Sequence, residues 1–387
     1  MKRIYVDARN LTATPSGVGR YAECLIPELV RQGRGRYRWV VVRHASNRRP
    51  MPWTGEADVA EVFLASEIGS ARDFGLGAAA LRQVVAQHGA PDLYHSLFHV
   101  IPLGLGTVVA PRPRIVVTLH DLIWIDHPIQ SQTSLGAALT IHLFARIAIR
   151  ATVRAADMVI CVSEATRLAA ERRFGKFRNT CVGHGVHDRY FQRHPPPDGE
   201  LGEWVARSTP YVVAVGNAKR YKNLQTLVGA FRASPFLRDR AKLVLVGPEA
   251  PLRELLRREG AGDEARATGF LDEEAFVRTL AHASAFVFPS TVEGYGLPPL
   301  EAMALGVPAL VADVEPMRSI CGSGATYFPP HGVSELATEL GRWLTDRSLR
   351  EEATRRGSAH VASLRWPSVA SATLDAYERT LCEHPTR

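Results

Sequence analysis

Short uninterrupted apolar runs alternate with helical stretches along the whole chain, and this alternation restricts the fold more than any other feature of the sequence. The runs in the first half are Arg3–Asp7, Trp39–Arg43, Leu93–His95, Ile115–Leu119 and Met158–Val162. Those in the second half are Tyr211–Val215, Leu243–Val246, Ala285–Pro289 and Ala309–Ala312. Continuous apolar runs separated by helices are typical of parallel strands that helices cover on both faces. The sequence therefore predicts an α/β protein built on parallel sheets.

The strands fall into two series, and a chain of 387 residues is longer than one hydrophobic core usually supports. The stiff polar segment His194–Gly199, which contains consecutive prolines, lies between the two series. We therefore predict an N-terminal Rossmann-like domain over residues 1–195 and a second one over residues 196–365. Residues 366–387 carry apolar side chains at helical spacing and are predicted to form a closing helix.

Composition and cysteine usage indicate a cytoplasmic globular protein. Hydrophobic residues make up 46% of the chain, and no run reaches about eighteen uninterrupted apolar residues, as a membrane span requires. The N-terminus runs directly into the first strand, so we expect no signal peptide. The five cysteines form no Cys-x-x-Cys pair and are expected to be reduced thiols rather than disulfides or zinc ligands.

The net charge of +8 is unevenly distributed. Residues 1–195 contain 25 Lys and Arg against 15 Asp and Glu, whereas the rest of the chain contains 22 against 24. No basic run or recognition-helix motif supports binding to nucleic acid. Attraction to an anionic acceptor, or peripheral contact with the anionic inner face of the plasma membrane, fits a one-sided charge better.

Glu293 and Glu301 lie eight residues apart, one in a glycine loop and the other in the helix that this loop opens. Pro298 and Pro299 suit the first helical turn, so unpaired backbone N–H groups there would face an anion such as a phosphate. Carboxylates on either side of that anion suit hydroxyl groups, Glu301 those of a ribose and Glu293 those of a pyranose. The pattern predicts a site for a sugar nucleotide.

The segment from Glu293 to Glu301, with Gly306-Val-Pro308 after it, resembles the retaining glycosyltransferases of family 4, which have the GT-B fold and an E-x7-E motif. The resemblance implies two Rossmann-like domains that face each other across a cleft, with the closing helix packed back on the first domain. It also implies that the glycine loop holds the donor through Gly294, Tyr295, Gly296 and Leu297, with Glu293 acting at the transferred sugar.

A second glycine loop, with Gly17 and Gly19, follows the first strand and opens a helix. Glycines at such a turn allow backbone N–H groups to approach a phosphate, and in family 4 the matching loop lies over the donor diphosphate. Gly17-x-Gly19-x-x-Ala22 also satisfies the dinucleotide fingerprint, so an NAD(P)-dependent oxidoreductase is an alternative. Two features argue against an oxidoreductase: the connection from the first strand to Gly17 is long, and no acidic residue follows the second strand. A purely structural turn remains open.

The loop after Tyr211–Val215 concentrates positive charge. The chain has only five lysines against 42 arginines, yet Lys219 and Lys222 both lie here, with Arg220 between them. Cations after a parallel strand lie at the carboxyl edge of the sheet and would neutralise a diphosphate leaving group. Family 4 usually has Arg-Lys-Asn here; Lys222-Asn223 matches, whereas Tyr221 stands in the Arg position. We expect Lys222 and Arg220 to act in catalysis and Gly216, Asn217 and Lys219 to bind the donor; a solvated charged loop is the alternative.

His120 and Asp121 follow the strand Ile115–Leu119. A lone histidine there is usually a core or capping residue, but family 4 members carry His-Asp or His-Asn at this place. The resemblance implies that His120 touches the transferred sugar and Asp121 the acceptor. The form His-Asp-Leu-x5-Pro resembles bacterial surface-polysaccharide transferases, many of them mannosyltransferases, so GDP-mannose is the favoured donor. A UDP- or dTDP-sugar with a soluble natural-product acceptor, and a catalytically silent sugar-nucleotide binder, are the alternatives.

Basic residues in the first half are candidates for binding the acceptor. Arg146 and Arg150 belong to a basic stripe with a four-residue period on an amphipathic helix, and Arg20 follows the first glycine loop. We expect a glycan or polyprenyl-diphosphate-linked saccharide as the acceptor, although most such stripes are solvated faces. No Asp-x-Asp pattern lies at a strand end, so we expect no metal and no cofactor.

Overall fold

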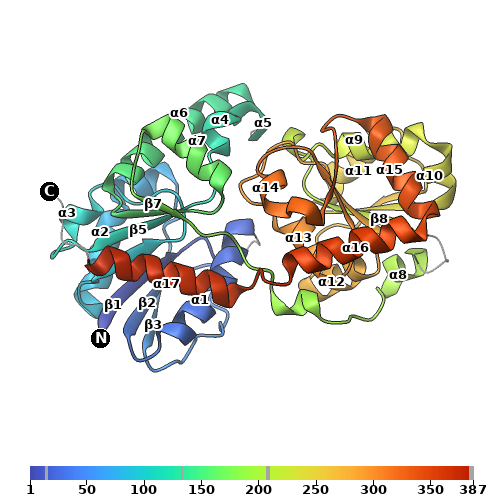
Figure 1. The fold of residues 1–387 in the computed structure, drawn as a ribbon. Coiled ribbons are helices and arrows are strands. Elements are labelled where there is room, and N and C mark those ends of the chain that lie inside the picture. Colours follow the sequence, from blue (N-terminus) through green and yellow to red (C-terminus); the bar gives the residue numbers. More distant parts are fainter. Residues whose placement is uncertain (14–15, 132–133, 206–209, 383–387) are drawn as a thin grey trace. The chain divides into compact units, whose positions relative to one another are not determined.

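A computed structural model describes residues 1–13, 16–131, 134–205 and 210–382, and the chain divides into two compact units. Unit 1 comprises Met1–Ile129, Ser134–Gly185 and Trp366–Arg387, and unit 2 contains Val186–Arg365. Each unit is a parallel sheet covered by helices, as the ribbon in Figure 1 shows. The prediction of two Rossmann-like α/β domains is confirmed.

Unit 1 has a seven-stranded sheet in the order β3-β2-β1-β4-β5-β6-β7, and every neighbouring pair is parallel. The strands are β1 (Lys2–Ala8), β2 (Tyr37–His44), β3 (Val59–Leu64), β4 (Leu93–Ser96), β5 (Arg114–Leu119), β6 (Met158–Cys161) and β7 (Asn179–Cys181). The order reverses between β1 and β4, and the loops after these two strands therefore diverge at the carboxyl edge, where such folds bind ligands.

The helices of unit 1 are α1 (Gly17–Gly33), α2 (Ala71–His88), α3 (Leu105–Val108), α4 (Ile123–Asp126), α5 (Pro128–Ser131), α6 (Leu135–Ala155), α7 (Glu164–Phe174) and α17 (Trp366–Cys382). Helix α17 packs against α1, and its residues Leu374 and Tyr377 belong to the same core as β1 and β2. The predicted closing helix on the first domain is confirmed. Residues 383–387 of that prediction lie outside the described part of the chain, as do Thr14 and Pro15 of the first glycine loop.

Unit 2 has a six-stranded parallel sheet in the order β10-β9-β8-β11-β12-β13. The strands are β8 (Tyr211–Val215), β9 (Lys242–Val246), β10 (Ala265–Ala267), β11 (Ala285–Phe288), β12 (Ala309–Ala312) and β13 (Thr326–Phe328). Its α-helices are α8 (Gly199–Val205), α9 (Leu224–Ala233), α10 (Pro235–Arg240), α11 (Glu249–Arg258), α12 (Glu273–Ala281), α13 (Leu297–Ala304), α14 (Met317–Cys321), α15 (Val333–Thr345) and α16 (Arg347–Val361). The short 3-10 helices are η1 (Asp188–Phe191), η2 (Arg220–Lys222) and η3 (Gly322–Gly324). The order reverses between β8 and β11.

The change from unit 1 to unit 2 falls after Gly185, before the boundary that we placed at residue 195. Val186 already donates its backbone N–H to the carbonyl oxygen of Leu364 at 2.8 Å, and Tyr190 is buried in the core of unit 2. The proline-rich segment therefore lies within unit 2, after the chain has entered it. A polar, proline-rich composition marks a loop, but it does not distinguish a linker from a loop on the surface of a domain.

Candidate functional site

The loops after β8 and β11 meet at the point where the strand order of unit 2 reverses. The backbone N–H of Thr291 donates to the carbonyl oxygen of Tyr221 at 2.8 Å, and the Asn223 Nδ2 donates to that of Pro289 at 3.0 Å. These bonds hold the lysine-bearing loop against the loop that carries Glu293. Two segments about seventy residues apart in sequence thus form one edge of the sheet.

Lys222 and Glu293 form a direct ion pair in this edge. The Lys222 Nζ lies 2.5 Å from the Glu293 Oε1, and the two side chains are 17% and 12% exposed. The ammonium group also lies 5.2 Å from the ring centre of Tyr221 and 5.5 Å from that of Phe288. An anion that enters here would meet a cation already held by one carboxylate and two aromatic rings. The structure therefore brings together two predicted site residues.

Lys219 and Arg220 are exposed beside this pair, whereas Asn223 is fully buried. Asn223 has a φ of +51°, which is rare for any residue other than glycine. Its side chain donates to the carbonyl oxygens of Pro289 and Pro330 and accepts from the Thr226 hydroxyl at 2.9 Å. The Lys-Asn dipeptide thus combines a cation with a residue that fixes the loop's shape.

Two features of the glycine loop before α13 require glycine at position 296. This residue caps α13 with a φ of +85°, and a Cβ there would lie 2.8 Å from the Met317 sulfur. Pro298 and Pro299 occupy the first turn, as predicted. Glu301 is buried in the second turn. A buried carboxylate therefore follows the glycine loop within the same helix. The other predicted donor residues in this loop are partly or fully buried: Gly294, Tyr295 and Leu297.

Gly247, which the sequence analysis did not select, fixes how closely the loops after β8 and β9 approach. Gly216 donates its N–H to the carbonyl oxygen of Val246 at 3.0 Å. A Cβ on Gly247, whose φ is +155°, would lie 1.9 Å from the Gly216 carbonyl oxygen. The only sequence feature that could have indicated Gly247 is its position directly after a buried strand, and glycines at such positions are common in α/β proteins. Asn217, at the same edge, accepts from the Lys219 N–H at 3.1 Å and closes the turn.

In unit 1, His120 follows β5 and is buried. Its Nε2 lies 3.0 Å from the carbonyl oxygen of Leu97, which follows β4, and the bond requires Nε2–H to be the donor. Burial lowers the pKa of His120 to about 4. The imidazole is therefore neutral near pH 7, with its hydrogen on Nε2 and a lone pair on Nδ1. Such a ring can accept a hydrogen bond but carries no charge.

Tyr21 of α1 and His184, which follows β7, pack against this imidazole, and Trp366 of α17 packs against both of them. The Tyr21 ring lies edge-on to His120 at 5.0 Å and tilted toward His184 at 4.7 Å, and His184 in turn stacks at 6.0 Å on Trp366. Burial lowers the pKa of His184 well below its usual value. The sequence analysis selected neither His184 nor Tyr21. Because distant segments assemble this cluster, no spacing of residues along the chain could have predicted it.

The two glycines of the first glycine loop differ: packing requires glycine at position 19, whereas Gly17 has open space around it. Ser16 caps α1 by accepting from the Gly19 N–H at 3.0 Å, and a Cβ on Gly19 would lie 3.1 Å from the Asn10 carbonyl oxygen. Around Gly17 a Cβ would meet no described atom within 4 Å. Gly19 is therefore explained by packing. Gly17 is exposed at the start of α1, where its backbone is accessible to a ligand.

The predicted acceptor residues have local structural roles or lie in solvent. The Asp121 Oδ1 accepts from the Ile123 N–H at 2.9 Å and so forms an Asx turn directly before α4. Arg146 and Arg150 are exposed on α6, and Arg20 is partly exposed on α1. Among the described residues, no group of three or more His, Cys, Asp and Glu gathers as metal ligands would.

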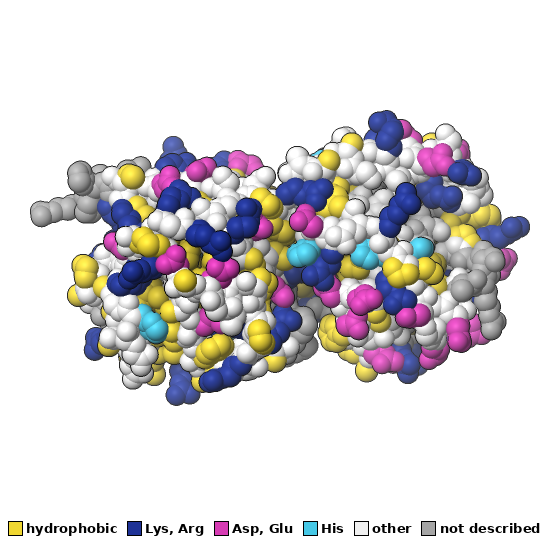
Figure 2. Space-filling model, turned by 90° about the horizontal axis from the view of Figure 1, so that it is seen from below, with side chains coloured by type: hydrophobic (Ala, Val, Ile, Leu, Met, Phe, Trp, Pro, Cys, Tyr) yellow, Lys and Arg dark blue, Asp and Glu magenta, His cyan; other side chains and the backbone are white. Residues whose placement is uncertain are grey.

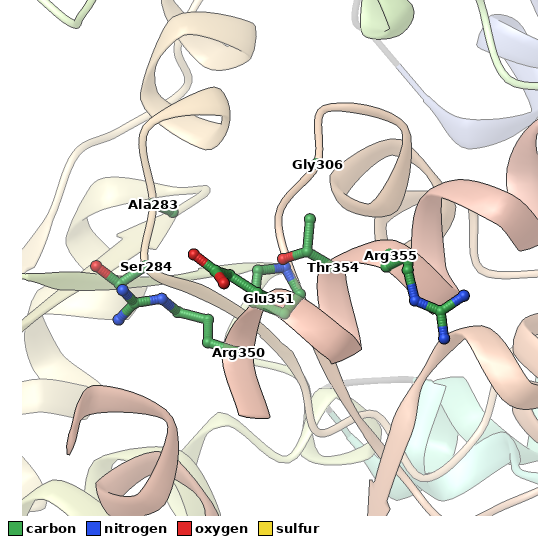
Figure 3. A pocket seen from close by; sticks show the side chains of 8 residues that line it. Ala283, Ser284, Gly306, Arg350, Glu351, Thr354 and Arg355 are labelled. Carbon is green, nitrogen blue, oxygen red and sulfur yellow. The ribbon is translucent and has the colours of Figure 1, made fainter. Parts of the chain in front are cut away.

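A cavity of about 390 Å³ lies at the opposite edge of the sheet of unit 2 (Figure 3). Ser284 and Pro308 line it directly before β11 and β12, that is, at the amino ends of these strands. Arg350, Glu351 and Arg355 of α16 contribute its charged side chains. This cavity contains none of the predicted site residues, and it is separate from the edge that holds Lys222 and Glu293.

Comparison with known proteins matches the two units to two related family profiles. Residues 15–190 match the profile described as Glycosyltransferase Family 4, and residues 205–360 match Glycosyl transferases group 1. The O-antigen chain mannosyltransferase B of Escherichia coli is 31% identical over 173 residues, which are 43% of this chain and 45% of that protein. The D-inositol 3-phosphate glycosyltransferase of Streptomyces griseus is 32% identical over 40% of this chain and 34% of its own length. The matched region thus spans less than half of these relatives.

Similar solved structures extend over nearly the whole chain. The sucrose-phosphate synthase of Thermosynechococcus elongatus has a TM-score of 0.75 at 19% identity and covers 98% of this chain and 99% of its own. Anabaena HepE, solved in complex with UDP and glucose, has a TM-score of 0.72 at 18% identity with 98% and 99% covered. At these identities the similarity shows the fold.

Proposed function

The chain belongs to glycosyltransferase family 4 and has the GT-B fold, and on this premise we propose that it transfers a hexose from a nucleotide diphosphate sugar to a saccharide acceptor, with retention of configuration and without a metal. The observation that carries the proposal is the Lys222–Glu293 pair at the strand-order reversal of unit 2, beside the start of α13. It combines a cation for a diphosphate with a carboxylate for sugar hydroxyls.

Leaving-group stabilisation is the main catalytic effect in this proposal. As the bond between the sugar and the diphosphate breaks, negative charge develops on the departing phosphate oxygen. Lys222, Arg220 and the backbone N–H groups of the loop that leads into α13 are of the right sign to stabilise that charge, because preorganised donors act most strongly where charge develops. These cations take the part that a divalent metal has in other transferases.

Glu293 and Glu301 have different partners in this proposal. Glu293 is paired with Lys222 at the loop, so it lies where the sugar next to the diphosphate would be and accepts from the sugar hydroxyls. Glu301 is buried on α13 and accepts from the ribose hydroxyls. Neutral His120 of unit 1 accepts a hydrogen bond from the transferred sugar through Nδ1. None of the three is assigned as a covalent nucleophile.

GDP-mannose is our favoured donor, and a glycan or polyprenyl-diphosphate-linked saccharide is our favoured acceptor. The support is the His120-Asp121-Leu122 segment and the similarity to curated mannosyltransferases, which include the O-antigen enzyme and a mycobacterial MMP alpha-(1->4)-mannosyltransferase at 33% identity over 35% of this chain. A UDP-sugar is the second candidate, because HepE is a structural neighbour solved with UDP-glucose. Family membership removes the support for the NAD(P)-dependent alternative.

The test is a panel of GDP-, UDP-, dTDP- and ADP-sugars assayed for binding and for transfer to saccharide acceptors, with and without a metal chelator. We expect GDP-mannose to bind most tightly and to support transfer that the chelator leaves unchanged. Transfer that survives in both Lys222→Ala and Glu293→Ala would show that the site is elsewhere. Binding without turnover over the whole acceptor panel would instead indicate a sugar-nucleotide binder.

A further inference from the structure

One face of helix α6 is buried in the core of unit 1. Its buried residues are Ala138, Ala145, Ala148, Ile149, Thr152 and Val153. The Thr152 hydroxyl accepts from the Ile101 N–H at 3.1 Å, which ties the helix to the segment after β4. Figure 1 shows α6 outside the sheet, near α4 and α7. The orientation of the helix is therefore set by packing, and its other face points away from the core.

That other face is apolar for most of its length. Leu135, Leu139, Leu143 and Ile147 follow one another at four-residue intervals and are 73%, 69%, 59% and 57% exposed. Residues four apart lie on the same side of a helix, so the four side chains form a continuous ridge. Single exposed leucines are ordinary, but contiguous apolar surface marks an interaction site.

The charge of α6 indicates which kind of partner this ridge would bind. The helix contains no aspartate or glutamate, and its exposed side also carries Arg146, Arg150 and Arg154. On the face in Figure 2, by contrast, Lys and Arg side chains lie among Asp and Glu. A helix with an apolar ridge and only positive charge beside it lies in the plane of a membrane interface. Its arginines would contact lipid phosphates.

We propose that α6 docks unit 1 onto the surface of an anionic lipid bilayer. The Leu135–Ile147 ridge enters the boundary between headgroups and acyl chains, and the three arginines bind headgroup phosphates. By length and mean hydropathy (1.3) α6 could also cross a membrane, but crossing would remove its buried face from unit 1. A second copy of the chain is a poorer occupant, because α6 offers no carboxylate to the arginines of a partner.

The experiment is co-sedimentation of the whole protein with vesicles of phosphatidylcholine alone or mixed with phosphatidylglycerol. We expect binding to the mixed vesicles only, weakened by salt. The double variant Leu139→Glu/Leu143→Glu should lose at least about tenfold in vesicle affinity, because it removes apolar contact and adds repulsion. The charge-matched control is Leu168→Glu/Phe270→Glu, which alters exposed apolar residues of α7 and of the loop after β10; it should bind as the unchanged protein does.

Nucleotide binding and thermal unfolding of the same variants show whether the fold and the donor site are intact. Retained nucleotide binding with lost vesicle binding supports the proposal, whatever the acceptor is. Equal vesicle binding by the α6 variant and the control would overturn it. So would a concentration-dependent dimer that the α6 variant abolishes in the absence of vesicle binding. The proposal rests on unit 1 alone, so it can fail while the proposed donor chemistry stands.

Discussion

Lys222 and Glu293 show how a pair of charged residues acquires a function that neither has alone. Each was predicted from its own loop, and the structure places their charged atoms 2.5 Å apart. A lysine that is already paired is oriented, but a carboxylate beside it also weakens its attraction for a diphosphate. The two residues should therefore have opposite effects on the binding of a nucleoside diphosphate that lacks the sugar.

Substitution of the two residues should separate diphosphate binding from sugar transfer. Lys222→Ala removes a charge-assisted contact and should weaken binding of the cognate nucleoside diphosphate by about 10- to 100-fold. Glu293→Gln should leave that binding unchanged or tighten it, yet lower the rate of transfer, because the carboxylate acts on the sugar. Calorimetric titration and initial rates measure the two effects. Equal losses of diphosphate affinity in both variants would contradict the separate roles.

His99 is a second residue whose environment predicts a measurable property. It is buried after β4 against Phe98 and Trp124, and neither ring nitrogen has a hydrogen-bond partner among the described residues. Burial lowers the pKa of His99 to about 3, below its ordinary value of 6.5. The unfolded chain therefore takes up a proton first as the pH falls below about 6.5, so that acidification destabilises the folded state down to about pH 3.

His99→Phe should flatten this pH dependence. Between about pH 7 and about pH 5 the unchanged protein should lose about 2 kcal/mol more free energy of unfolding than the variant, because one histidine with this pKa difference is removed. Chemical denaturation at the two pH values measures the difference. Phe98→Leu is the control, since it alters the same packing without a titratable group. Parallel losses in His99→Phe and the unchanged protein would show that His99 does not contribute.

At the scale of elements, the strands that the sequence analysis missed share one property. They are β3, β7, β10 and β13. Each is the outermost strand of its sheet, where one side has no neighbouring strand. Such strands are less buried and need no continuous apolar run, as the half-buried β3 shows. The central strands, which are buried on both faces, were all predicted, and the loops that carry Lys222, Glu293 and His120 follow them.

The loop before α13 gives a prediction for one element. Gly296→Ala should destabilise unit 2 by about 1–3 kcal/mol, because a side chain at a φ of +85° is strained and would overlap the Met317 side chain. Nucleotide binding should weaken as well, since the start of α13 shifts. Gly75→Ala on α2 is the control: its Cβ would meet no described atom within 4 Å, so it should be neutral or stabilising. Thermal unfolding measures both, and equal stability of the two variants would contradict the argument.

At the scale of the whole molecule, the last helix belongs to the unit formed by the beginning of the chain. Leu374 of α17 is buried with β1 and α1 in unit 1, although unit 2 separates them in sequence. Leu340 of α15 is equally buried in unit 2. The two leucines therefore provide matched probes of the two cores.

Leu374→Ala should lower the stability of unit 1 by about 2–5 kcal/mol, and Leu340→Ala should lower that of unit 2 by a similar amount. Hydrogen exchange followed by mass spectrometry distinguishes them. We expect faster exchange in β1 and β4 for the first variant and in β8 and β9 for the second. Faster exchange in β8 caused by Leu374→Ala would show that the units do not have separate cores.

The sequence by itself determined the two parallel α/β units, the loops that carry the site and most of the residues in them, because continuous apolar strands and glycine loops are local patterns. Only the tertiary structure decided that Lys222 pairs with Glu293, that His120 is a neutral Nε2–H imidazole enclosed by Tyr21 and His184, and that the leucines of α6 face outward. Ion pairing, tautomer and burial depend on atoms that distant segments bring together. No spacing along the chain specifies them.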